Sequence, residues 1–262
     1  MFTPKTERIR GLAERNPDVI EKMTGLFSGA ANVYIDHANV RPWSEKLWWH
    51  IEPRRVKQFL QSFDAVRSIK FYQGKLVGDP RSQKEIKHLQ SLECGRFMLR
   101  TKPVKIMRFS VDTTSVDIQS PILLRRFIRA SLLRKMDVET IEFLNQKLQA
   151  MNKNGIYELE DRKCNFDVEI GADMRVDHLK DGIDTFVLWS GDSDFADPIR
   201  QLLADGKRVL LFATARRVAS ELDALQREGL LIFDIQKIRN FICWLHEVEE
   251  KAKGTPFGAP KL

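Results

Sequence analysis

The sequence predicts an α/β fold in which a mainly parallel sheet is flanked by helices. Short apolar, β-prone segments alternate with amphipathic helical segments along most of the chain, a pattern typical of a parallel sheet. The segments at 185–190 and 207–213 are almost wholly apolar in their centres, as strands buried on both faces are. The chain of 262 residues is long enough for one large domain of this class with additions.

The first part of the chain is expected to supply the first strands of this sheet. Residues 1–30 are predicted to form one or two amphipathic helices that extend the fold at its N-terminus. The segment 31–36 follows as a short buried strand that ends in Asp36. Further helices are expected at 54–63 and 81–92, and further strands at 65–72, 97–100 and 104–109.

Residues 110–153 differ in character from the rest and are predicted to form an inserted helical hairpin. Its first helix, at 122–136, is basic, and its second, at 138–151, is amphipathic. A charged helix face is usually just solvated, but a basic face beside an acidic site could hold a phosphate backbone. The basic residues of the first helix are Arg125, Arg126, Arg129, Arg134 and Lys135.

The chain is expected to return to the main sheet after the turn at Asn154-Gly155. We predict helices at 165–174, 196–204 and 216–225, strands at 185–190, 207–213 and 230–233, and a closing helix at 235–248. The tail at 249–262, rich in glycine and proline, is expected to be disordered. The predicted main domain therefore spans residues 31–248.

Composition limits the class of protein without assigning a function. The formal charge is +7 and the isoelectric point near 9.3, which is weak evidence for a polyanionic partner. The three cysteines are far apart and form no CxxC pair, which predicts neither a zinc site nor a disulfide framework and favours a reducing, cytoplasmic setting. No apolar run is long enough for a membrane span and no signal peptide is expected, so we predict no membrane partner.

Acidic residues follow two of the predicted strands. Asp36 ends the first strand, and Asp192 and Asp194 come directly after the strand at 185–190. In open α/β sheets, ligands bind at the carboxyl ends of the strands, where we expect these acids to lie. One acid of the pair could simply cap the following helix, but capping does not require both.

Clustered carboxylates repel one another unless a hard cation lies among them. Mg²⁺ prefers a few carboxylates and waters, and leaves room for phosphate oxygens of a substrate. Acids after strands, without a set of His or Cys ligands, therefore favour metal-assisted phosphodiester chemistry over a zinc site. The simpler alternative is a group of helix caps and surface acids.

The residues around these acids form recognisable motifs. The segment 188–195 reads Leu-Trp-Ser-Gly-Asp-Ser-Asp-Phe, and the segments 33–40, 163–173 and 206–222 accompany it in a fixed order. Together they resemble the NYN family, the branch of the PIN-like nuclease superfamily that includes LabA-like bacterial proteins. The resemblance covers about residues 31–110 and 154–245, and the Ser-Gly-Asp-Ser-Asp-Phe run is specific only in company with the other segments.

The resemblance implies a PIN-like three-layer fold and a metal-dependent nuclease that uses Mg²⁺ or Mn²⁺, with RNA as the expected nucleic-acid partner. It implies a metal and catalytic site made of Asp36, Asp167, Asp192 and Asp194. Asn39 and Ser190 would orient the substrate or a metal-bound water. Candidate phosphate contacts, each of which could also be a plain surface charge, are Lys75, Arg81, Arg216 and Arg217. A homodimer is compatible with the sequence.

Other features leave alternatives open. Asp173 lies six residues after Asp167, about 240° round a helix, so it either reaches the site from a helix end or forms a structural pair. The sequence departs from the family at His37-Ala38, where a small or acidic pair is frequent, and in its long insertion; both leave the choice of substrate open. Trp43, Trp48 and Trp49 could stack on bases or anchor the fold.

Two rival functions remain. A non-catalytic nucleic-acid-binding or regulatory protein could keep the fold, although a retained acid cluster without a metal would cost stability. A phosphatase of the haloacid dehalogenase type would need a second Asp two residues after the first, and position 38 is Ala.

Overall fold

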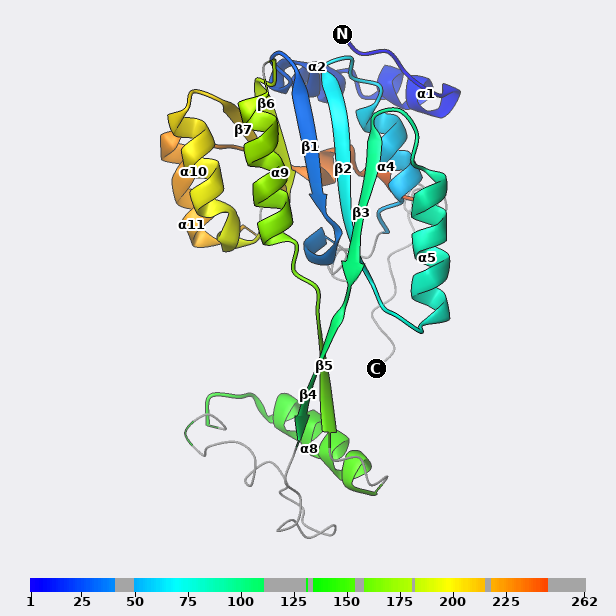
Figure 1. Cartoon of the computed structure of the whole chain (residues 1–262), viewed down its shortest axis with the longest axis vertical. Helices are drawn as coiled ribbons and strands as arrows, with labels where there is room; N and C mark the ends of the chain where they lie inside the picture. The colour runs from blue at the N-terminus through cyan, green and yellow to red at the C-terminus, as the bar shows by residue number, and fades with distance from the viewer. Residues whose placement is uncertain are drawn as a thin grey trace. The chain divides into compact units, whose positions relative to one another are not determined.

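The computed structural model describes residues 1–40, 50–110, 131, 134–153, 158–180, 182–214 and 218–244 (Figure 1). The chain divides into two compact units. One is built from Met1–Val104 and the segment that begins at Cys164, and the other is Lys105–Lys163.

The first unit contains a six-stranded sheet in which every neighbouring pair of strands is parallel. The strand order is β3-β2-β1-β6-β7-β8, so the order reverses between β1 and β6. The predicted α/β fold with a parallel sheet is therefore confirmed. The strands are β1 (Ala31–Asp36), β2 (Val66–Lys75), β3 (Phe97–Pro103), β6 (Thr185–Trp189), β7 (Arg208–Ala213) and β8 (Leu231–Asp234).

Helices flank this sheet. Figure 1 shows α9, α10 and α11 on one side of it and α4 and α5 on the other. Helices on both sides explain why all residues of β1 and β6 are buried, and why these strands lack the apolar–polar alternation of a half-exposed strand. The helices are α1 (Glu7–Arg15), α2 (Pro17–Leu26), α4 (Pro53–Leu60), α5 (Pro80–Ser91), α9 (Asp167–Leu179), α10 (Ala196–Ala204), α11 (Ser220–Ala224) and α12 (Arg239–Ile242).

The helices α1 and α2 confirm the helices expected in residues 1–30. Ile9 and Met23 are fully buried and join the same hydrophobic core as the sheet. The start of β1 is fixed by Asp184, whose carboxylate accepts a hydrogen bond from the backbone N–H of Ala30 at 3.0 Å. Gly29 has a φ of 70° and lies so close to this carboxylate that a Cβ atom would clash with it.

A buried polar cluster joins α9 to the sheet. Asn32 and Tyr34 are two positions apart in β1, so their side chains lie on the same face of the sheet. Lys70, in the neighbouring strand β2, pairs with Tyr34. All three side chains donate to Oδ2 of Asp177, at 2.8 Å, 2.7 Å and 2.8 Å respectively. Burial tends to raise the pKa of Asp177, but these partners prevail, so the carboxyl has a lowered pKa and is held ionised.

The second unit differs from the predicted hairpin. Its helix α8 (Val138–Lys153) matches the second predicted helix. The unit also contains two strands, β4 (Lys105–Ser110) and β5 (Glu158–Lys163), which pair with each other antiparallel. The strand β5 was hidden because its sequence, Glu-Leu-Glu-Asp-Arg-Lys, has almost no apolar residue. The first predicted helix does not reach residue 136, since Arg134 and Lys135 form a turn, and its residues 122–130 lie outside the described part.

The closing helix predicted at 235–248 is also wrong in form. A 3-10 helix at Ile235–Ile238 is followed by α12, which ends at Ile242. The helix stops there because Cys243 pairs with Ile51 in an isolated bridge and cannot continue a helical path. Residues 245–262, including the predicted tail, lie outside the described part. Among the described helices, none combines the length and apolar character that a membrane span requires.

Candidate metal centre

The acids predicted from the sequence lie where the strand order reverses. β1 and β6 are parallel neighbours, with Ile35 paired to Trp189 near their carboxyl ends. Asp36 is the last residue of β1, and Ser190 to Asp194 follow directly after β6. In doubly wound sheets, the crevice at this reversal is the usual place for a ligand.

Three carboxylates converge at this crevice. Oxygen atoms of Asp167, Asp192 and Asp194 all lie within 4.8 Å of one another. Asp167 is the first residue of α9, whereas Asp192 and Asp194 belong to the turn after β6. Asp167 and Asp192 are partly buried and Asp194 is exposed, so the group opens to solvent on one side.

The turn that carries Asp192 and Asp194 is held by its own hydrogen bonds. The Asp192 carboxylate caps a 3-10 turn, Ser193–Phe195, and accepts from the N–H of Asp194 at 3.3 Å. The N–H of Asp192 donates to Oγ of Ser190 at 3.3 Å. Phe195 is fully buried and anchors the end of the turn in the core. Asp192 therefore caps this turn, whereas neither Asp194 nor Ser193 caps α10, as the simpler alternative would require. The carboxylates of Asp192 and Asp194 both belong to the cluster.

Asp36 lies beside this group rather than within it. Its carboxylate is almost fully buried and accepts from the N–H of Asn39 at 3.3 Å and from Oγ of Ser190 at 3.5 Å. Burial raises the pKa of Asp36 to about 6, and the nearby charges of Asp167 and Asp192 add to the rise. The structure thus brings together three of the four predicted ligands and places the fourth within electrostatic reach of two of them.

Of the three carboxylates, that of Asp167 has the surroundings that a bound cation would stabilise most. Both of its carboxylate oxygens are shielded from solvent, and neither accepts a hydrogen bond of normal geometry from any described residue. Burial raises the pKa of this carboxyl, and the charges of Asp192 and Asp194 raise it further. The side chain of Asn165 lowers the pKa but does not outweigh these effects. The position at the start of α9 partly offsets this cost, since helix N-termini favour negative charge.

These observations fit a hard divalent cation. Three oxygen ligands lie close enough to share one ion. Within the described part of the chain, two carboxylate oxygens of Asp167 have no hydrogen-bond partner, and no His or Cys joins the group. An opposite charge among the carboxylates would offset both the repulsion and the burial that raise the pKa of Asp36 and Asp167.

Asn39 and Ser190 support the acids. Oδ1 of Asn39 accepts from the N–H of Gly191 at 3.0 Å and so joins the segment after β1 to the turn after β6. Ser190 is fully buried and bridges Asp36 to the backbone of Asp192. Both side chains help to fix the geometry of the site, and the expectation that they orient a substrate or a metal-bound water stays a prediction.

The predicted phosphate contacts are placed only in part. Lys75 ends β2 at the same carboxyl edge as the acids, and Arg81 lies in the first turn of α5. Both are exposed, and no ion pair within the described residues joins either of them to the cluster. Arg216 and Arg217 lie outside the described part, as do Trp43, Trp48 and Trp49 and the basic residues Arg125, Arg126 and Arg129.

Asp173 forms a structural pair and does not join the metal group. Its Oδ2 accepts from the hydroxyl of Tyr72 at 2.6 Å and lies 3.5 Å from Nε of Arg100. Its Oδ1 lies 3.5 Å from Nζ of Lys70. Of the two alternatives left open by the helix geometry, the structure therefore supports the second.

Other residues that shape this region were not expected from the sequence. Lys102 pairs with Glu169 at 2.6 Å, and its ammonium lies 4.7 Å from the centre of the Phe166 ring, next to Asp167. Gly74 lies against Cys164, so closely that a Cβ atom at Gly74 would meet Sγ at 2.8 Å. No local pattern in the sequence places Lys102 or Gly74 beside the start of α9. The two residues pair with each other in β3 and β2, and such positions depend on contacts between distant segments.

The fold and the three converging carboxylates define an α/β protein with a candidate metal centre. Residues 123–229 match the model of the NYN domain, the family that the motifs resemble. The matched segment contains Asp167, Asp192 and Asp194, whereas Asp36 lies before it.

The comparison with solved structures lists a protein of unknown function from Vibrio parahaemolyticus. It is 16% identical, with a TM-score of 0.46, and the match covers 83% of the present chain and 98% of the other. No curated protein matches the sequence.

Proposed function

We propose that this protein is a metal-dependent nuclease that hydrolyses phosphodiester bonds, with RNA as its substrate. The observation that carries the proposal is the group formed by Asp167, Asp192 and Asp194, which includes two buried oxygens without a hydrogen-bond donor. The match of residues 123–229 to the NYN domain model supports the proposal, because it suggests a nuclease-like superfamily.

The three carboxylates would hold Mg²⁺ or Mn²⁺. When bound, such an ion lowers the pKa of a coordinated water and stabilises the charge that develops on a phosphodiester group. Asp36 would add negative charge behind the group, and Ser190 would keep Asp36 and the backbone of Asp192 in register. Lys75 and Arg81, exposed at or near the same edge, would bind phosphates that flank the reacting one.

The proposal is tested by incubating the full chain with labelled single-stranded RNA, duplex RNA and DNA in Mn²⁺, Mg²⁺ or EDTA. We expect cleavage of RNA that EDTA abolishes and that Asp192→Asn reduces to background, because Asn keeps the shape but removes a charge that the cation needs. A circular RNA added to the same series separates endonuclease from exonuclease action.

The matched control is Asp197→Asn. Asp197 lies in the first turn of α10, five positions after Asp192, and its side chain is 92% exposed and paired with Arg200. The Asp197→Asn variant should cleave RNA at the same rate as the parent protein. Binding of RNA without cleavage by the parent, in every metal tested, would instead support the non-catalytic alternative.

A cytoplasmic location is proposed as well, on narrower grounds. The three cysteines are free thiols, and Cys94 is exposed, which suits a reducing compartment better than an oxidising one.

A further inference from the structure

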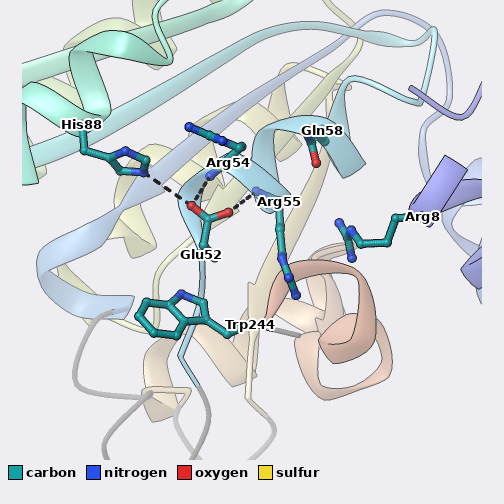
Figure 2. A pocket seen from close by; sticks show the side chains of 7 residues that line it. All are labelled: Arg8, Glu52, Arg54, Arg55, Gln58, His88 and Trp244. Atoms are coloured by element: carbon teal, nitrogen blue, oxygen red, sulfur yellow. Dashed lines mark hydrogen bonds and ion pairs between the residues drawn. The ribbon is translucent and has the colours of Figure 1, made fainter. Parts of the chain in front are cut away.

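The sheet unit holds a second site, a basic cavity away from the three carboxylates. Its volume is about 460 Å³, within the usual range for small-molecule sites. Figure 2 shows that its lining comes from α1, from α4 with the residue before it, from α5 and from the chain just after α12. The residues used below are Arg8, Glu52, Arg54, Arg55, His88 and Trp244.

Two of the arginines are fixed in place by backbone carbonyl groups. Arg8 donates to the carbonyl oxygens of Asn240 at 3.3 Å and Phe241 at 3.0 Å, and Arg55 donates to that of Cys243. A guanidinium has five N–H donors, so each keeps donors that these bonds do not use. Burial and the nearby charge of Arg55 lower the pKa of Arg8, as expected where two like charges share a site without enough anionic partners.

The third arginine has its side chain available. Arg54 is exposed, and its guanidinium makes no hydrogen bond or ion pair within the described residues. Figure 2 shows it on the same side of the cavity as His88. Because Arg54 is exposed and unpaired, it can bind an incoming anion without breaking a contact of the fold.

Among the described residues that line the cavity, one is a carboxylate, and it is already engaged. Glu52 accepts from the N–H groups of Arg54 at 3.1 Å and Arg55 at 2.8 Å, which caps α4, and it lies 3.5 Å from Nε2 of His88. Three guanidinium groups and one carboxylate give these described lining residues a net charge of two positive charges. A phosphate monoester, which carries close to two negative charges at neutral pH, complements this balance.

An aromatic ring completes the lining. The backbone N–H of Trp244 donates to the carbonyl of His50 at 3.3 Å, which holds the residue at the cavity wall. The Trp244 side chain is nevertheless 53% exposed, a large fraction for a residue whose ring usually packs in the core. The indole ring lies 5.8 Å from the ring of His50, between ring centres, and shares the cavity lining with the arginines. Nucleobases stack on exposed aromatic faces of this kind in proteins that bind single strands.

We propose that this cavity binds a nucleoside phosphate monoester, with the phosphate on Arg54 and the base on Trp244, while Arg8 and Arg55 add positive charge to the same lining. The ligand is either a free mononucleotide or the phosphorylated end of a strand. The site does not depend on the three carboxylates, so it goes beyond the proposed nuclease activity and requires no metal.

The test measures binding to the full chain in EDTA, where no metal-dependent cleavage occurs. The probes are AMP, adenosine, inorganic phosphate, and one short RNA with either a 5′-phosphate or a 5′-hydroxyl end. We expect AMP to bind at least about tenfold more tightly than adenosine or phosphate, because each lacks one half of the recognised group. Tighter binding of the 5′-phosphorylated RNA than of AMP would identify strand ends as the source, and the reverse would identify the free nucleotide.

The variants separate the two halves of the site. Arg54→Gln should weaken AMP binding by about tenfold or more and leave adenosine unchanged. Trp244→Leu should weaken AMP but leave inorganic phosphate unchanged. Arg67→Gln, an exposed arginine of β2 outside the cavity, is the matched control for lost charge. AMP affinity that is equal in Arg54→Gln and the parent, or lowered as much by Arg67→Gln, would overturn the proposal, and so would no binding of AMP or of 5′-phosphorylated RNA.

Discussion

Oγ of Ser190 lies 3.5 Å from Oδ2 of Asp36 and donates to it, although Asp36 ends β1 and Ser190 directly follows β6. The same oxygen accepts from the N–H of Asp192 at 3.3 Å. One buried hydroxyl therefore links the acid after β1 to the acids after β6. This link explains how carboxylates from separate parts of the chain keep a constant spacing at the reversal of the strand order.

Removal of that hydroxyl should disturb the site as well as the fold. In Ser190→Ala, the N–H of Asp192 and the carboxylate of Asp36 each lose a partner in a buried place, at a cost of about 1–3 kcal/mol in the free energy of unfolding. Denaturant unfolding measures this loss, and metal-dependent cleavage of RNA should fall with it. Ser220→Ala, at an exposed serine, should change stability by less than about 0.5 kcal/mol. Equal stability of the two variants would contradict the bridging role of Ser190.

A divalent cation should stabilise the folded protein through the three carboxylates. At a Mn²⁺ concentration 100 times the dissociation constant, binding adds about 2.7 kcal/mol, or several degrees in melting temperature. Asp167→Asn should abolish this rise, whereas Asp36→Asn should keep part of it, because Asp36 lies outside the group of three. Thermal melting with Mn²⁺ and with EDTA gives the comparison. A larger loss in Asp36→Asn than in Asp167→Asn would place the ion elsewhere.

The buried carboxyl of Asp36 should make the metal-free protein less stable as the pH rises. Its pKa is about 6 in the folded protein, against an ordinary value of 3.8, so the folded state binds this proton more tightly than the unfolded state. The resulting stabilisation is complete below about pH 4 and is lost as the pH rises to about 6, a change of up to about 3 kcal/mol.

Asp36→Asn isolates that contribution, because Asn cannot titrate. In EDTA, the variant should gain stability relative to the parent between pH 4 and pH 7, although the charge of Asp167 affects both proteins in the same direction. Asp197→Asn should follow the parent at every pH. A constant difference between Asp36→Asn and the parent over this range would show that Asp36 is not buried as an ionisable group.

The sequence was sufficient to predict the class of fold and to place acidic residues at the ends of two of its strands. Asp36, Asp192 and Asp194 could be placed at one edge because parallel strands share the edge at which they end. Strand order could not be read in this way, since it depends on contacts between distant segments. The cavity lined by Arg8 and Trp244 was unpredictable for the same reason. The strand β5 was unpredictable because its sequence contains few apolar residues.

Helix geometry was informative for Asp173, but it could not choose between the two roles. An angle of about 240° from Asp167 argued against a shared face, and the structure adds the reason why Asp173 points toward the sheet. Tyr72, Lys70 and Arg100 lie on neighbouring strands and supply a hydroxyl and two cations to it. The partners of a buried acid are decided by the strands that it covers, which no local pattern records.

The last prediction compares two lysines that bind the same carboxylate. Nζ of Lys70 lies 2.8 Å from Oδ2 of Asp177 and is buried, whereas Nζ of Lys180 lies 3.4 Å from Oδ1 and its side chain is 66% exposed. Lys70→Ala leaves Asp177 and part of the Asp173 interaction uncompensated in the core, which should cost about 3–5 kcal/mol. Lys180→Ala removes a solvent-exposed pair and should cost less than about 1 kcal/mol. Urea unfolding at neutral pH measures both losses. Equal effects of the two single variants would mean that burial does not decide the strength of these pairs.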